Sequence, residues 1–531
     1  MEGLKKMRAI LILMDTLRKD VLNIYNEKSK VKTPNLDAFS ERALVFDNHF
    51  IGSTPCMPAR RDLMTGRLNF LERSWGPIEP FDETFPKVLQ NAKIFTHLTT
   101  DHCHYFRQGG EDYINQFTTW DLHRGQEGDP WVSKIKDPEW MPQDFYGRLR
   151  KQYQKNRTKW YEDEEKYPTP RTFKSACEWI EDNKDEDNFF LQVEVFDPHE
   201  PFDVPSKYMK MYDPEYNGPY FETPIYGESD VPARAEKYIR NRYSALVTMT
   251  DTHFGRLIDK LKELNMFDDT LIIVTSDHGY LLGERGLFGK NYMHNFNELA
   301  AIPLMVHDPE GRCENERTEK VSQNVDVMPT ILDYFGLEIP ADVRGESWYP
   351  IFNKQGKKYR KKYALYGAHG ITVNVTDGHY TYFRAPNKKN KPLYEYAGIP
   401  TTIRHWLGEN NPEKIEMGRF LKRTKYPVYK VPIDKPAILD GLGDMSKYTK
   451  DNLLFDIKED PKQVRLLKNK QIEEKYKKIM VEQLRYNDAP EEQYERLNLK
   501  NIREKNEQAK RMIKNLDCCT NNSKNVDDKN E

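Results

Sequence analysis

The chain has 531 residues, which is long enough for more than one domain and for a large buried core. Lysine and arginine number 82 against 84 aspartates and glutamates, so the formal net charge is -2 and no basic field favours nucleic acid. The apolar run at residues 9–14 is too short for a signal peptide or a membrane span, and no later run is long enough to cross a membrane. We therefore expect a soluble, cytoplasmic protein that binds neither nucleic acid nor membrane, with its oligomeric state left open.

Three short apolar runs each lead to an acidic residue. Residues 9–14 precede Asp15, residues 189–196 precede Asp197, and residues 270–276 precede Asp277. Such runs are typical of buried parallel strands, whose C-terminal ends form ligand sites in open α/β sheets. Residues 243–264 place apolar side chains at helical spacing. The alternation predicts an α/β fold with a mixed, mostly parallel sheet between helices.

The composition changes near residue 350. Residues 363–384 alternate around Thr376-Asp377-Gly378, which predicts two strands joined by a tight turn. From about residue 459 the chain is rich in lysine, glutamate and glutamine. We predict a catalytic domain over residues 1–350, a subdomain with a small antiparallel sheet over 351–470, and a charged, solvated helical tail over 471–531 with a disordered end.

The segment Pro55-Cys56-Met57-Pro58-Ala59-Arg60 carries the strongest chemical signal. A cysteine between two prolines at the start of a short helix lies where free N–H groups favour an anion. Arg60, one turn later, offers a planar fork for a carboxylate or a tetrahedral oxyanion. A thiolate phosphatase would need arginine six positions after Cys56, where Asp62 stands, so that mechanism is excluded. The other cysteines form no C-x-x-C pair, so they do not indicate a structural zinc site.

This motif, Cys56, Pro58 and Arg60 followed by a Leu-x-Thr-Gly turn at residues 63–66, resembles the sulfatases of the alkaline phosphatase superfamily. The similarity extends over roughly residues 8–467, through Asp15 and the segments 33–36, 197–202, 276–279, 283–284, 302–304, 454–456 and 460–461, together with Lys290. The resemblance implies an alkaline-phosphatase-like fold and hydrolysis of sulfate esters of a small compound or a sugar.

In sulfatases a separate maturation enzyme oxidises the motif cysteine to formylglycine, whose aldehyde hydrates beside a divalent cation. One hydroxyl of the hydrate attacks sulfur, and the other then expels sulfate. The resemblance implies that Asp15, Asp277, His278 and the converted Cys56 bind one divalent cation. Calcium is the first choice for this set, with magnesium and manganese as alternatives.

The remaining predicted site residues are cations and histidines. Arg60 and Lys290 are expected beside the sulfate oxyanion, and His199 is expected to donate a proton to the leaving alcohol or to contact a sulfate oxygen. His102 is expected as a weak oxyanion contact, His104 is undecided, and zinc binding by His102-Cys103-His104 lacks an evident fourth ligand. Five further residues either line the entrance of the site or anchor the core and loops. They are Trp75, Trp120, Arg124, Trp131 and His369.

Two departures from the commonest sulfatase pattern keep alternatives open. Thr16 stands where many sulfatases have a second acid, and His278 where many have asparagine. Asp277-His278-Gly279 also resembles the choline sulfatase and phosphonate monoester hydrolase branches. A phosphonate monoester or phosphate ester hydrolase of the same fold therefore stays open. So does a binding protein without catalytic activity in which Cys56 stays a thiol.

Overall fold

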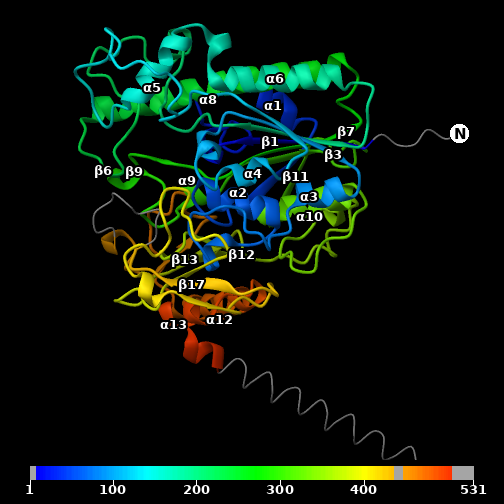
Figure 1. Cartoon of the computed structure of the whole chain (residues 1–531), viewed down its shortest axis with the longest axis vertical. Coiled ribbons are helices and arrows are strands. Elements are labelled where there is room, and N and C mark those ends of the chain that lie inside the picture. Colours follow the sequence, from blue (N-terminus) through cyan, green and yellow to red (C-terminus); the bar gives the residue numbers. More distant parts are fainter. Residues whose placement is uncertain (1–6, 436–445, 505–531) are drawn as a thin grey trace, which may run out of the picture.

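The computed structural model describes residues 7–435 and 446–504, and its centre is an eight-stranded sheet (Figure 1). In spatial order the strands are β11 (Glu316–Gln323), β2 (Leu44–Phe50), β10 (Leu304–His307), β7 (Thr270–Ser276), β1 (Arg8–Met14), β5 (Phe189–Val195), β3 (Phe95–Thr100) and β4 (Thr119–Leu122). The sheet is mostly parallel, and β10 runs antiparallel to both of its neighbours. The three strands predicted from apolar runs are β1, β5 and β7, which lie side by side.

Helices cover both faces of this sheet, which explains why its central strands are apolar throughout. In β1, Ile10, Ile12 and Met14 pack into one hydrophobic cluster, and the alternate residues 9, 11 and 13 pack into a second cluster on the other face. One face is covered by α1 (Pro34–Ser40), α6 (Pro168–Asp182) and α8 (Ala233–Glu263), and the other by α2 (Cys56–Thr65), α3 (Phe85–Asn91) and α10 (Val327–Tyr334) (Figure 1).

Short elements connect these layers. The short helices are α4 (Glu111–Ile114), α5 (Lys151–Asn156), α7 (Ser206–Met209), α9 (Asn297–Ala300) and α11 (Tyr349–Phe352). A small sheet joins β6 (Gly227–Glu228), β9 (Leu287–Gly289) and β8 (Leu281–Leu282). The helix predicted over residues 243–264 is the later part of α8, which begins ten residues earlier, after Pro232. Within the described residues, no helix combines the length and the apolar character needed to cross a membrane.

The C-terminal part contains two antiparallel sheets. The first joins β12 (Ala364–Gly367), β13 (Val373–Thr376), β14 (Tyr380–Arg384) and β18 (Leu453–Asp456), and the second joins β15 (Tyr394–Ala397), β17 (Val428–Pro432) and β16 (Glu416–Gly418). The predicted hairpin is β13–β14, with Gly378 in the left-handed region at φ +82°. The segment holds one more strand than predicted, because the chain turns at Gly370 (φ +74°) and separates β12 from β13.

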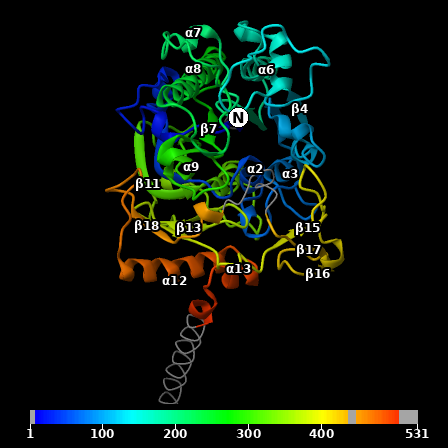
Figure 2. The ribbon, with the colours of Figure 1, turned by 90° about the vertical axis from the view of Figure 1, so that its left-hand side faces the viewer.

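After residue 470 the sequence predicts a charged, solvated helical tail, and the structure has helices there that are packed against the C-terminal sheet. Helix α12 (Lys470–Tyr486) packs against the sheet of β12 and β13, and α13 (Glu491–Arg496) follows it (Figure 2). Tyr476, Met480 and Leu484 are fully buried there. The charged composition of this segment belongs to the solvent-facing side of an amphipathic helix. The predicted disordered end lies in residues 505–531, outside the described residues.

Candidate active site

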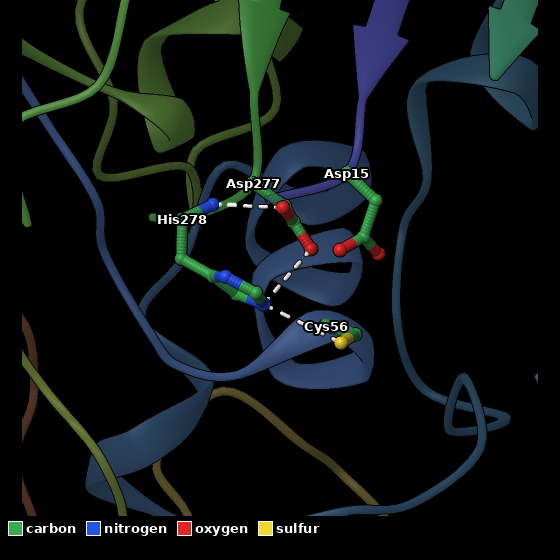
Figure 3. Close-up of side chains that lie close together, drawn as sticks. All are labelled: Asp15, Cys56, Asp277 and His278. Atoms are coloured by element: carbon green, nitrogen blue, oxygen red, sulfur yellow. Dashed lines mark hydrogen bonds and ion pairs between the residues drawn. The ribbon is translucent and has the colours of Figure 1, made fainter. Parts of the chain in front are cut away.

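Four predicted metal ligands converge where two central strands end (Figure 3). Asp15 follows β1 and Asp277 follows β7, and these parallel neighbours pair in register up to their last residues. Cys56 is the first residue of α2, as the flanking prolines predicted. One donor atom from each of Asp15, Cys56, Asp277 and His278 lies within 4.8 Å of the others, and all four residues are buried.

The ring of His278 is oriented so that one nitrogen faces this cluster. Its Nδ1 donates to the carbonyl oxygen of Gly279 at 2.9 Å, which leaves Nε2 without a proton in the neutral ring. Burial lowers the pKa of His278 to about 4, so the ring is neutral near pH 7. Its Nε2 lies 3.2 Å from Asp277 Oδ2 and 3.4 Å from Cys56 Sγ (Figure 3). A lone-pair nitrogen facing a carboxylate oxygen is explained by a cation between them, so the donor set fits a divalent metal ion.

Arg60 binds protein carboxylates rather than facing the substrate. Its guanidinium donates to Asp15 Oδ2 at 2.9 Å, to Asp277 Oδ2 at 2.8 Å and to Glu194 Oε1 of β5 at 2.8 Å. It also donates to the carbonyl oxygen of Cys56 at 3.1 Å, and the residue is 1% exposed. Burial alone would raise the pKa of Asp15, but Arg60 holds it well below its usual range. Arg60 therefore positions the carboxylates of Asp15 and Asp277, and its guanidinium faces these acids rather than the predicted sulfate oxyanion.

Glu194 is a site residue that the sequence interpretation missed. It lies within β5, and both its flanking strands and its side chain are buried. An acidic residue inside a buried strand, which is otherwise apolar except for Gln192, requires a buried partner, because an unpaired buried charge is strongly unfavourable. That signal was present in the run at residues 189–196, but it does not reveal that the partner is Arg60.

Lys290 contacts Cys56, and His199 is held by its neighbour Glu200. Lys290 Nζ is 3.6 Å from Cys56 Sγ and 3.3 Å from Thr16 Oγ1. Burial alone would lower the pKa of Lys290, but the neighbouring charges of Cys56 and Glu200 raise it, so the ammonium stays charged. The Nδ1 atom of His199 lies 2.6 Å from the carbonyl oxygen of Glu200 and 3.2 Å from its carboxylate. Glu200, which also went unnoticed in the sequence, thus fixes the ring of His199.

His102 differs from its predicted place as an oxyanion contact. It is fully buried, and its Nε2 lies 3.7 Å from Asp15 Oδ2. Its Nδ1 accepts a hydrogen bond from the peptide N–H of His104 at 3.2 Å, so Nε2 carries the ring proton and points toward Asp15. Burial lowers the pKa of His102, so the ring is neutral. His102 therefore faces the carboxylate of Asp15.

The chain is similar to known proteins. Residues 8–337 match the family model Sulfatase. The chain belongs to the sulfatase family. An N-acetylglucosamine-6-O-sulfatase from Bacteroides thetaiotaomicron is 32% identical over 157 residues, which span 29% of this chain and 28% of that protein. The predicted family is thus confirmed, and this sulfatase hydrolyses sulfate esters.

Solved structures confirm the predicted fold class. The structure of a protein in complex with its substrate D-glucosamine-2-N,6-O-disulfate has a TM-score of 0.62 and 16% identity, covering 91% of this chain and 98% of that one. A phosphonate monoester hydrolase of Agrobacterium radiobacter has a TM-score of 0.61 and 18% identity, covering 90% and 94%. At these identities the likeness to solved structures shows only the fold of the sulfatase.

A cavity of about 280 Å³ opens at Cys56 of the sulfatase. Its lining includes Cys56, His199, Lys290 and Trp75. The other predicted entrance candidates, Trp120, Arg124, Trp131 and His369, are not part of the lining. His369 is instead a buried anchor whose Nδ1 bonds the carbonyl oxygen of Phe70 at 2.8 Å.

A second cluster on the cavity wall joins Cys103, His104 and Glu127. Glu127 lies 3.8 Å from His104 Nε2 and 3.5 Å from Cys103 Sγ, but His102 is not part of this cluster, so a fourth ligand is still lacking among the described residues. In addition, Arg150 already binds Glu127 at 2.6 Å, and Arg107 lies 4.0 Å away. Two guanidinium groups around the carboxylate disfavour a further cation. The cluster is better explained as part of a positively charged wall.

Proposed function

We propose that this sulfatase releases sulfate from a sulfated sugar, with a formylglycine made from Cys56 as the nucleophile and one bound divalent cation. The observation that carries the proposal is the convergence of four buried donor residues, of which Cys56 also lines a cavity together with Lys290 and His199. The similarity to an N-acetylglucosamine-6-O-sulfatase supports a sugar as the alcohol part of the ester.

The cation would be held by Asp15, Asp277, His278 and the converted Cys56. Two carboxylates favour a hard cation, so calcium is the first choice, and the imidazole keeps magnesium and manganese as alternatives. When bound, the cation supplies positive charge that acidifies the nucleophile and draws electron density from the sulfate oxygens. Arg60 keeps the two aspartates in position for it.

The other side chains act on the ester itself. The charged ammonium of Lys290, next to Cys56, is placed to neutralise a sulfate oxygen. The ring of His199 is fixed through Nδ1 by Glu200, so Nε2 is the nitrogen available to give a proton to the leaving alcohol oxygen. The proposal also requires a maturation enzyme that oxidises Cys56. We propose that the protein is cytoplasmic and that this oxidation takes place in the cytoplasm.

A second candidate is hydrolysis of phosphonate or phosphate monoesters on the same site. It is favoured by His278 at the metal-binding cluster and by the fold shared with a phosphonate monoester hydrolase.

Mass spectrometry of the peptide that contains Cys56 tests the nucleophile, because conversion of the thiol to an aldehyde lowers its mass by a fixed amount. Cys56→Ala is expected to abolish turnover of an aryl sulfate without unfolding the protein. Cys177→Ala, a half-buried cysteine of α6, is the matched control and should keep full turnover. An active sample with only unmodified Cys56, or full turnover by Cys56→Ala, would contradict the mechanism. Aryl sulfate and aryl phosphonate esters, assayed side by side, decide between the two candidates.

A further inference from the structure

Three polar side chains that line the cavity at Cys56 have hydrogen-bonding atoms that the protein does not satisfy. They are Nε1 of Trp75, Oε2 of Glu200 and Oγ1 of Thr223, none of which has a hydrogen-bond partner within the part of the chain that the structure describes. The three residues are 3%, 1% and 1% exposed, in that order. An unpaired buried polar group costs free energy, so three of them around one cavity indicate a ligand that pairs with them.

The ring of Trp75 is held by its neighbours, so its N–H is the part left for a ligand. The guanidinium of Arg404 lies 4.6 Å from the ring centre. The ring of His104 meets the indole edge-on, with 4.8 Å between the ring centres and 71° between the planes. An indole N–H only donates, so its partner has to be an acceptor, such as a hydroxyl or ether oxygen.

Glu200 has the opposite requirement. Its Oε1 accepts from the hydroxyl of Tyr226 at 2.6 Å. The Nδ1 atom of His199 lies 3.2 Å from Oε2, but it donates its proton to the carbonyl oxygen of Glu200 at 2.6 Å. Burial alone would raise the pKa of Glu200, but His199 and Lys290 hold it below its usual value, so the carboxylate is ionised. The partner of Oε2 therefore has to be a donor.

Thr223 offers a hydroxyl that both donates and accepts, on a backbone that is fixed. Its carbonyl oxygen accepts from the peptide N–H of Arg148 at 2.8 Å. Gly147 permits this approach, because it has φ +71° and a Cβ atom there would lie 2.3 Å from the same oxygen. Three segments that are distant in the chain thus bring a donor, an acceptor and a hydroxyl to one cavity.

We propose that Trp75, Glu200 and Thr223 determine specificity by hydrogen-bonding the neutral hydroxyl and ring oxygens of the alcohol part of the ester. The inference rests on the proposed function and names the residues of the same site that select a polyhydroxylated ring over an aryl or alkyl alcohol. Each hydroxyl of such a ring both donates and accepts, so the ring satisfies all three side chains. A hydrocarbon ring satisfies none of them and leaves them buried without a partner.

Binding to the Cys56→Ala protein tests this independently of turnover. Calorimetry compares glucose 6-sulfate and galactose 6-sulfate with cyclohexylmethyl sulfate, which has a six-membered ring and the same charge but no hydroxyl groups. The tighter-binding sugar should bind about tenfold or more tightly than the cyclohexyl ester. Because the three ligands have equal charge, this preference should change little as salt is added.

Trp75→Phe and Thr223→Val, each added to Cys56→Ala, should weaken sugar binding about fivefold or more and change the affinity for the cyclohexyl ester by less than about twofold. Ser229→Ala in the same background is the matched control and should change neither affinity. The hydroxyl of Ser229 also lacks a partner among the described residues, but Ser229 does not line the cavity.

Equal affinity for the sugars and the cyclohexyl ester, equal losses for both kinds of ligand in the two variants, or no binding of any of the three ligands would overturn the inference. Equal losses accompanied by lower melting temperatures would assign Trp75 and Thr223 a structural role instead. These affinities do not depend on formylglycine. Absence of aryl sulfate hydrolysis by the unmutated protein would therefore count against the proposed function alone.

Discussion

Replacement of Arg60 by lysine tests how the metal-binding carboxylates are held in place. The guanidinium spans Asp15 after β1, Asp277 after β7 and Glu194 on β5, at 2.9, 2.8 and 2.8 Å. Lysine keeps the positive charge but presents it at one point, so it cannot reach all three carboxylates. We therefore expect two of the three contacts to be lost in Arg60→Lys.

The size of the effect follows from these contacts. A hydrogen bond to a charged group contributes about 1.5–3 kcal/mol, so loss of two gives about 3–6 kcal/mol. The positive charge that lysine keeps and local relaxation reduce this loss of stability. For comparison, removal of one partner from a buried ion pair typically costs about 3–5 kcal/mol. We expect Arg60→Lys to lower the free energy of unfolding by about 3–5 kcal/mol and to weaken cation binding. Excess cation should restore part of the loss, because it neutralises Asp15 and Asp277.

Urea unfolding with saturating calcium and after chelation measures both effects, and cation titration measures the affinity. Arg61→Lys is the control, because Arg61 is buried on the same helix and binds Asp82 at 2.6 and 3.0 Å, away from the metal-binding cluster. It should lose stability to a similar extent without a change in cation affinity. If Arg60→Lys kept the unfolding free energy and the cation affinity of the parent protein, the positioning role of Arg60 would be refuted.

Three further predictions concern the cation, the leaving group and pH. Chelation, or Asp277→Asn, should abolish sulfate release by withdrawing positive charge from the nucleophile, and an unchanged rate in a metal-free sample would contradict this. His199→Ala should lower kcat/KM by ~100-fold or more for a sugar sulfate and by less for the sulfate of an acidic phenol, whereas equal losses would leave His199 without a role as general acid. Burial lowers the pKa of His369 from 6.5 to about 4, so the unfolded state binds more protons between these values and stability is lost as pH falls through that window. This loss of unfolding free energy reaches about 3 kcal/mol near pH 4. His369→Phe should therefore reduce the change of the unfolding free energy with pH, as measured by urea unfolding. An unchanged pH dependence would disprove this.

The parts of the site that were predictable depend on local rules. An apolar run that stops at an acid fixes where a buried strand ends, and parallel neighbours bring those ends together, so Asp15 and Asp277 were expected side by side. The prolines around Cys56 placed it at the first turn of α2, where the free N–H groups are. The family motif added the cation and the formylglycine, and these stay proposals for this chain.

Only the tertiary structure decided which charges meet. In the sequence, Arg60 one turn after Cys56 was equally consistent with binding a substrate oxyanion or a carboxylate of the protein. The structure shows that it binds Glu194 from β5. Arg148 and Arg404 are ordinary loop arginines in the sequence, yet both line the cavity above Cys56. Helical spacing and strand periodicity govern residues that are near in the chain, whereas ion pairs between distant segments depend on how loops and sheets pack, and a charge by itself does not specify its partner.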